Sequence, residues 1–156
     1  MSSKSPGRRE LIARVIGLIR ENADRTDQLD QLSAARFGLN RTDGRGFEIL
    51  MRLGPMTANR LAAQLGMTTG GVTTVIDRLE KAGYARRRHD KNDRRLVLVE
   101  ATERGEQKER EIFGELIAAT ARLVGSYGDA ELQVIADYLE RVGAIVVKHV
   151  DRLARG

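Results

Sequence analysis

The sequence predicts a mainly helical protein of the α+β class, in which long helices at both ends flank a small domain with one β-hairpin. Three observations lead to this prediction. Apolar residues recur at helical spacing near both ends of the 156-residue chain. Residues 57–83 contain two threonine-capped helix patterns joined by a glycine. Residues 84–99 contain two strand patterns joined by six polar residues.

Composition excludes several classes of protein. The chain has no cysteine, which excludes disulfides and thiolate metal sites and fits a reducing compartment. No stretch is apolar over the length of a membrane span, so we expect a cytoplasmic protein without a membrane partner. The formal charge is +5, and residues 84–95 alone hold an excess of four positive charges. Such clustering is typical of nucleic-acid binding, and a solvated basic turn is the alternative.

The N-terminal segment predicts a long helix. Ser5 and Pro6 are typical of a helix start, and Phe37-Gly38 is typical of its end. The apolar residues of this helix share one face and include Leu11, Ile12, Val15, Ile16 and Ile19. A shorter helix is predicted over about 42–53, where Gly54-Pro55 stops it. Its core-facing residues are expected to be Phe47, Leu50 and Met51.

Residues 57–83 predict a helix-turn-helix. Thr57 caps the first helix and Gly66 ends it, while Thr68 caps a second helix that ends at Gly83. Helical spacing buries four apolar residues of the second helix, namely Val72, Val75, Ile76 and Leu79. The outward face then holds Thr69, Gly70, Thr73, Thr74 and Asp77.

The outward face of the second helix suits contact with DNA. In a helix-turn-helix this N-terminal half enters the major groove, where threonine hydroxyls and methyls can contact bases. Gly70 and Gly71 have two interpretations. They allow either close approach of the helix backbone to DNA or a loose first turn.

The C-terminal half predicts a hairpin followed by two helices. Residues 84–89 and 96–99 read as strands, and residues 90–95 form the tip. Thr102 caps a helix that ends near Gly128, and Asp129 caps a final helix that runs to about Ala154. The apolar stripe of the final helix is too long for one small domain to cover, so we expect a partner chain.

Two stretches, LGMTTGGVTTVIDRLEKAGYARR and DKNDRRLVLVEAT, resemble the MarR family of bacterial transcriptional regulators. The matching residues are Asp77-Arg78-Leu79-Glu80, Gly83, Asp90, Asp93, Arg94 and Arg95. Glu100-Ala101 departs from the family, which often has leucine just before the position of Thr102. The resemblance implies a winged helix-turn-helix DNA-binding domain over 40–102, a connecting helix over 103–125, and dimerisation helices over 1–38 and 126–156.

The function implied by the resemblance is a nucleoid-associated homodimer that binds an inverted-repeat operator in double-stranded DNA. It would act as a sequence-specific repressor that a small aromatic or phenolic effector releases. The helix from about Thr68 would lie in the major groove and the wing in the minor groove. Arg94 is most like the family's wing-tip arginine, and Asp90 and Asp93 are expected to accept loop hydrogen bonds so that Arg94 projects.

These expectations assign residues to two surfaces. DNA contacts are expected from Thr57, Thr68, Thr69, Gly70, Gly71, Thr73, Thr74, Arg78, Arg88, Arg94 and Arg95. Dimer contacts are expected from Leu11, Ile12, Val15, Ile19, Leu132, Ile135, Leu139, Val142, Val146 and Val150.

The alternative function is a winged-helix module that binds protein, or that binds DNA without sequence preference. Residues 68–83 are charge-balanced, whereas non-specific binding needs basic residues along the helix. No catalytic constellation predicts an enzyme, and no cofactor is expected. His89, Asp90 and Asp93 lie among arginines without a second histidine nearby, which does not favour a metal site. Aromatic residues could line an effector pocket or belong to the core, namely Phe37, Phe47, Phe113 and Tyr127.

Overall fold

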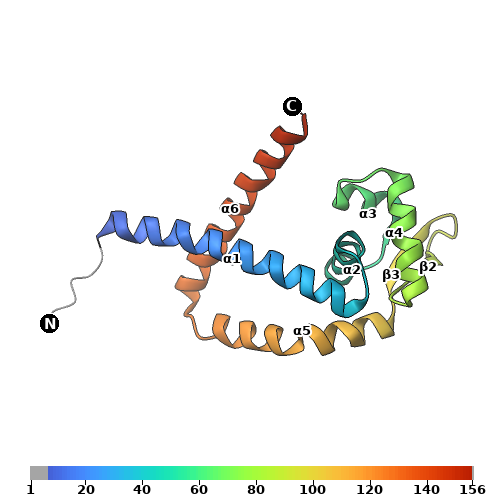
Figure 1. Cartoon of the computed structure of the whole chain (residues 1–156), viewed down its shortest axis with the longest axis horizontal. Coiled ribbons are helices and arrows are strands. Elements are labelled where there is room, and N and C mark those ends of the chain that lie inside the picture. Colours follow the sequence, from blue (N-terminus) through green and yellow to red (C-terminus); the bar gives the residue numbers. More distant parts are fainter. Residues whose placement is uncertain (1–6, 156) are drawn as a thin grey trace. The chain divides into compact units, whose positions relative to one another are not determined.

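The computed structural model describes residues 7–155. Ser5 and Pro6, the predicted helix start, lie outside this range; within it the first helix begins at Arg8, after Gly7 in the cap position. The elements in chain order are α1 (Arg8–Phe37), α2 (Arg41–Leu53), β1 (Met56–Thr57), α3 (Ala58–Leu65), α4 (Thr69–Ala82), β2 (Ala85–His89), β3 (Val97–Ala101), α5 (Glu103–Val124) and α6 (Asp129–Arg155) (Figure 1). The predicted mainly helical fold with a small sheet is confirmed.

Threonine caps and glycines define most helix ends. Thr57, Thr68 and Thr102 each accept a hydrogen bond from the backbone N–H three residues ahead, at 3.1–3.3 Å, as predicted. Glycines with positive φ end α1, α3 and α4, namely Gly38, Gly66 and Gly83. The predicted cap of α6 was wrong. Asp129 is its first helical residue, and the carbonyl of Gly128 accepts the first helical bond.

A three-stranded antiparallel sheet with the order β1-β3-β2 joins the helix-turn-helix to the hairpin. β1 was not predicted, because two residues between a proline and a helix show no alternation. Its Met56 pairs with Val99. β3 continues to Ala101, two residues beyond the predicted strand, because Glu100 pairs with Arg86 of β2 instead of ending the ladder.

The core of the helix-turn-helix is apolar and tightly enclosed. The four α4 residues predicted to be buried are 0% exposed, namely Val72, Val75, Ile76 and Leu79. On α2, Phe47, Ile49 and Leu50 are buried, whereas Met51 is only half-buried, contrary to the prediction. Ile49 takes its place because the face of α2 that packs on the core holds Asp43, Gly46, Phe47, Ile49 and Leu50.

An aromatic cluster joins α1, α2 and the start of the hairpin. The ring centroids of Phe37, Phe47 and Tyr84 lie 5.2–5.8 Å apart. In the same interior the Tyr84 hydroxyl donates a hydrogen bond of 3.2 Å to the carbonyl oxygen of Phe37. Gly105 of α5 backs the cluster: a Cβ at this position would lie 2.8 Å from both the Phe47 ring and the Tyr84 carbonyl oxygen.

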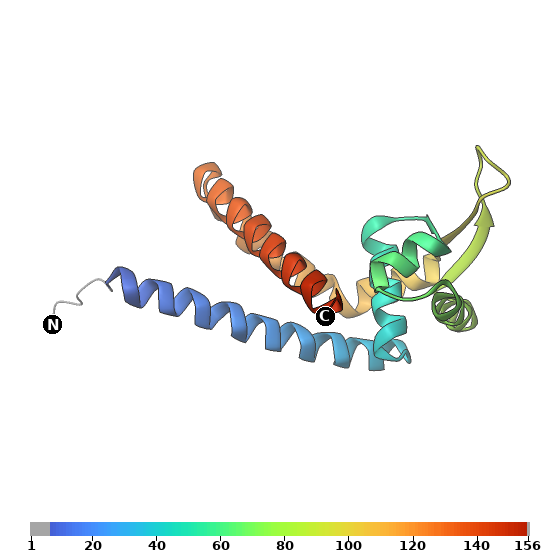
Figure 2. The ribbon, with the colours of Figure 1, turned by 90° about the horizontal axis from the view of Figure 1, so that it is seen from above.

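The chain divides into two compact units, one up to Ile112 and one from Phe113 on. In the first unit, α1 buries only Ser33, Ala34 and Phe37, and its N-terminal part extends away from α2, α3 and α4 (Figures 1 and 2). In the second unit, α6 has no buried residue over its described length, 129–155. Among the described residues, no helix is long and apolar enough to cross a membrane.

Candidate nucleic-acid interface

The outward face of α4 is open to solvent and largely uncharged. Thr69, Gly70, Thr73, Thr74 and Asp77 are all exposed, as their spacing predicted. The Thr73 hydroxyl donates to the carbonyl oxygen of Thr69 at 3.0 Å, so its lone pairs and methyl group are left for a partner. The oxygens of the two predicted DNA contacts at cap positions, Thr57 and Thr68, hold their helices, and each O–H group can still donate.

Gly70 and Gly71 belong to a regular first turn of α4. Thr68 accepts hydrogen bonds from the N–H groups of Gly71 and Val72, at 3.2 and 3.0 Å, which argues against a loose turn. A Cβ at Gly71 would lie 3.1 Å from the terminal methyl of Met67, but a Cβ at Gly70 would meet nothing within 4 Å. The fold of the chain therefore does not require glycine at position 70.

Arg78 connects α4 to α2. Its Nε and Nη2 atoms donate to the two carboxylate oxygens of Asp43, each at 2.7 Å, and the Asp43 side chain is 3% exposed. The hydrogen bond to Asp43 raises the pKa of Arg78. This ion pair gives Arg78 a structural role that the sequence prediction did not include.

Glu100 holds two of the hairpin arginines on the outer face of the sheet. Arg86 Nε and Arg88 Nε donate to its two carboxylate oxygens at 2.8 and 2.5 Å. The hydrogen bond from Arg88, helped by Arg86, outweighs desolvation and lowers the pKa of Glu100. Arg88, a predicted DNA contact, is thus already paired within the hairpin.

Arg87 lies on the opposite face of β2 and bonds to α4. Its Nη2 donates to Asp77 Oδ1 at 2.7 Å, and its Nη1 is paired with Glu80. Its backbone N–H also donates to Glu80 Oε1, at 2.8 Å. The positive charge counted in the hairpin is therefore partly neutralised by carboxylates that lie outside residues 84–95.

The wing tip, residues 90–95, is held by its own acidic side chains and projects beyond α4 (Figure 2). Asp90 Oδ1 accepts from the N–H groups of Asn92 and Asp93 at 2.8 and 3.0 Å, and Asp93 Oδ1 accepts from the N–H of Arg95 at 3.0 Å. The bonds from Asp93 and Asn92 lower the pKa of Asp90. The expected loop hydrogen bonds of both aspartates are present, while the contact of Arg94 with DNA stays a prediction.

The unpaired positive charge of the hairpin lies at this tip. Among the described residues, Lys91, Arg94 and Arg95 form no ion pair. An open hollow of about 530 Å³ is lined by His89, Asp90, Lys91 and Arg94. His89 Nδ1 donates to the Arg94 carbonyl oxygen at 2.9 Å and so helps to close the loop. The site therefore combines a helix whose outward face is largely uncharged with a basic projecting loop.

Comparison with known proteins identifies the family. The model of the MarR family matches residues 39–97. Over 153 residues the chain is 35% identical to the uncharacterized HTH-type transcriptional regulator YcgE of Bacillus subtilis (strain 168), an alignment that covers 98% of this chain and 99% of YcgE. The chain belongs to the MarR family. Members of this family are transcriptional regulators.

Solved structures share the fold of this MarR-family chain. NadR in complex with 4-hydroxyphenylacetate is 24% identical, with a TM-score of 0.58 over 91% of this chain and 96% of NadR. A single-site mutant of S. aureus MepR, bound to an oligodeoxyribonucleotide, is 17% identical, with a TM-score of 0.55 over 85% of this chain and 97% of MepR. At these identities the likeness shows the winged-helix fold.

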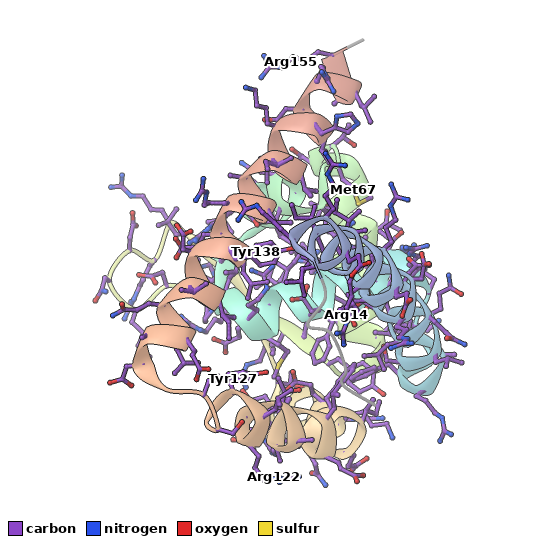
Figure 3. The ribbon with its side chains drawn as sticks, turned by 90° about the vertical axis from the view of Figure 1, so that its left-hand side faces the viewer. Arg14, Met67, Arg122, Tyr127, Tyr138 and Arg155 are labelled. Atoms are coloured by element: carbon purple, nitrogen blue, oxygen red, sulfur yellow. The ribbon has the colours of Figure 1, made fainter. Side chains whose placement is uncertain are left out.

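The four aromatic residues considered for an effector pocket of the MarR-family chain lie in different surroundings. Phe37 and Phe47 are buried in the aromatic cluster with Tyr84, so they belong to the core. Phe113 is half-buried, and Tyr127, at the turn between α5 and α6, is 41% exposed (Figure 3). Phe113 and Tyr127, both in the second unit, therefore stay the candidates for an effector pocket.

Proposed function

We propose that this chain is a homodimeric repressor that binds an inverted-repeat operator, with α4 in the major groove and the wing tip in the minor groove. The observation that carries the proposal is the outward face of α4. Its threonines and Gly70 can approach base edges without the uniform positive charge of a non-specific binder. The basic wing tip beside it suits the negative potential of the minor groove.

The proposed dimer is supported by the exposed apolar faces of α1 and α6. Residues 8–32 of α1 and all of α6 contain no buried residue, although both helices carry apolar stripes. Exposed apolar surface on this scale marks an interface. A two-fold dimer requires an operator with two half-sites about one helical turn apart, roughly 10 base pairs. The residue ranges proposed for dimerisation are 1–38 and 126–156, and the connecting helix covers 103–125.

Control by a small aromatic or phenolic effector is a further part of the proposal. Its support is the family membership and the relative NadR, whose structure contains 4-hydroxyphenylacetate. Binding must favour a dimer geometry that fits DNA poorly, and operator DNA must then weaken effector binding by the same factor. Titration of 4-hydroxyphenylacetate with and without saturating operator measures this factor, and equal affinities would contradict control by this compound.

Arg94→Ala is expected to weaken binding to operator and to random DNA alike. Arg94 is an unpaired cation at the wing tip, so its loss removes about one phosphate contact per subunit and lowers the salt dependence of binding accordingly. Binding isotherms at several salt concentrations on both duplexes measure the effect. Arg122→Ala, at the end of α5, is the control and leaves the slope unchanged. A loss confined to operator would mean that Arg94 reads sequence.

Gly70→Ala is expected to stabilise the protein and yet to weaken operator binding at least tenfold. Alanine is favoured over glycine in a helix by about 0.5–1 kcal/mol, and its Cβ has open space here. Bound DNA would meet that Cβ if the helix backbone approaches the bases. Urea unfolding and operator titration measure the two effects. Unchanged operator affinity would show that the DNA does not approach the backbone at this point.

A further inference from the structure

Arg87 joins the wing to α4 through three separate bonds. Its guanidinium contacts Asp77 and Glu80, which lie one turn apart on α4, and its backbone N–H contacts Glu80 as well. The side chain is about two-thirds buried, with 34% of its surface exposed. Arg86 and Arg88, its neighbours on β2, point to the other face and bind Glu100 within the hairpin. Arg87 is thus the arginine of the strand that crosses from the wing to α4.

The two carboxylates are unexpected on a helix that binds DNA. Asp77 lies on the outward face of α4 and is 59% exposed, where phosphate groups would repel it. Burial opposes the charge of Arg87, but the hydrogen bond with Asp77 and the charges of Glu80 and Asp77 outweigh it and raise the pKa of Arg87. One cation of the basic hairpin is therefore paired with two anions of α4.

We propose that Arg87, Asp77 and Glu80 form a positioning device that sets the angle of the wing to α4, so that the basic wing tip reaches DNA as a group. This inference rests on the proposed DNA-binding function. The tip itself has few other ties to the helices, because its hydrogen bonds close within residues 89–96. Without the device, the tip would lose its fixed orientation, and the DNA contacts of Lys91, Arg94 and Arg95 would be lost together.

The decisive variant is Asp77→Asn combined with Glu80→Gln, because simple electrostatics and positioning predict opposite signs. Removing two anions near DNA would strengthen binding if charge alone mattered. Positioning predicts at least a tenfold weaker binding despite the added positive charge. The matched control is Glu111→Gln with Glu115→Gln, two exposed carboxylates on α5 that lie outside the proposed DNA-binding and dimerisation surfaces. It changes the net charge equally and is expected to leave binding unchanged or slightly stronger. The probe is a duplex recovered from random DNA by selection with the wild-type protein.

Footprinting of the wild-type and variant proteins measures the DNA contacts of the wing and of α4 separately. In the Asp77→Asn/Glu80→Gln variant we expect the hydroxyl-radical protection of the minor groove by the wing to disappear, while protection of guanine N7 in the major groove persists. The salt dependence should fall by up to about three phosphate contacts per subunit. Tighter binding than wild type, or an intact wing footprint, would overturn the positioning role.

A double-mutant cycle tests whether Arg87 acts through the tip. Arg94→Ala should weaken binding in the wild-type background but change it less than about twofold in the Arg87→Ala background. Equal losses in both backgrounds would make Arg87 an independent phosphate ligand and overturn the inference. Arg87→Lys, which keeps one ion pair, should restore part of the wing footprint, and thermal unfolding checks that each variant is folded. If the wild-type protein recovers no duplex, the proposed function itself fails.

Discussion

Leu139→Glu in α6 is expected to convert the proposed dimer into a monomer and to reduce operator binding by more than about a hundredfold. Leu139 lies midway along α6 and is 61% exposed in the single chain, on the stripe that includes Ile135 and Val142. Two-fold symmetry would bring two such carboxylates into one apolar interface, and each costs several kcal/mol to bury without a partner. Sedimentation at micromolar concentration should show about one chain mass for the variant and two for the wild type.

The control for this experiment is Ala144→Glu. At 100° per residue, Ala144 lies nearly opposite the stripe of Leu139 on the same helix. It is exposed and should accept glutamate with no change in mass or in DNA affinity. A Leu139→Glu variant that still sediments as a dimer would place the interface elsewhere.

Gly105→Ala is expected to destabilise the protein by at least about 2 kcal/mol. Its Cβ would lie 2.8 Å from a ring carbon of Phe47 and from the carbonyl oxygen of Tyr84. That carbonyl accepts a hydrogen bond from the N–H of Thr102 at 3.0 Å, and the Phe47 ring is held between two other aromatic rings. Neither neighbour can move without losing a contact, so the strain remains in the folded state.

The same helix provides the matched control for Gly105. Gly114→Ala adds the same methyl group in α5, where nothing lies within 4 Å of the new Cβ. This variant should gain about 0.5–1 kcal/mol from helix propensity alone. Urea midpoints of the two variants should therefore shift in opposite directions. Shifts of the same sign would mean that the Gly105 environment relaxes around the added methyl.

The helix-turn-helix could be predicted from the sequence because its helix caps and its buried face depend on residues that lie close together in the chain. The capping side chains of Thr57, Thr68 and Thr102 reach N–H groups only three residues ahead, and four residues at helical spacing predicted the buried side of α4. β1 escaped prediction because its two residues are defined by pairing with Val99 and Leu98, more than 40 positions later. Which side of α2 faces the core depends in the same way on its neighbours, and Ile49 was missed for that reason.

The sequence predicted how many charged side chains the site contains, but not which of them form ion pairs with one another. Counting within the hairpin could not reveal that Glu80 and Asp77, on a different element, neutralise Arg87. Strand alternation was the available signal, since it places Arg87 on the face opposite Arg86 and Arg88. The pairing of Arg78 with Asp43 had no such signal, because the two residues are 35 positions apart. The residues assigned to DNA contact remain predictions for the experiments above.

The hydrogen bond between Tyr84 and Phe37 couples the orientation of the hairpin to that of α1. Phe37 is the last residue of α1, and Tyr84 directly precedes β2. Separating them would leave the buried carbonyl oxygen of Phe37 without a hydrogen-bond partner. The end of the helix and the start of the hairpin should therefore move together. With its 30 residues α1 is about 45 Å long, at roughly 1.5 Å per residue. A displacement of about 4 Å at its free end corresponds to a tilt of roughly 5° at its fixed end. We therefore expect that a molecule bound at the N-terminal end of α1 changes the orientation of the hairpin without contacting it.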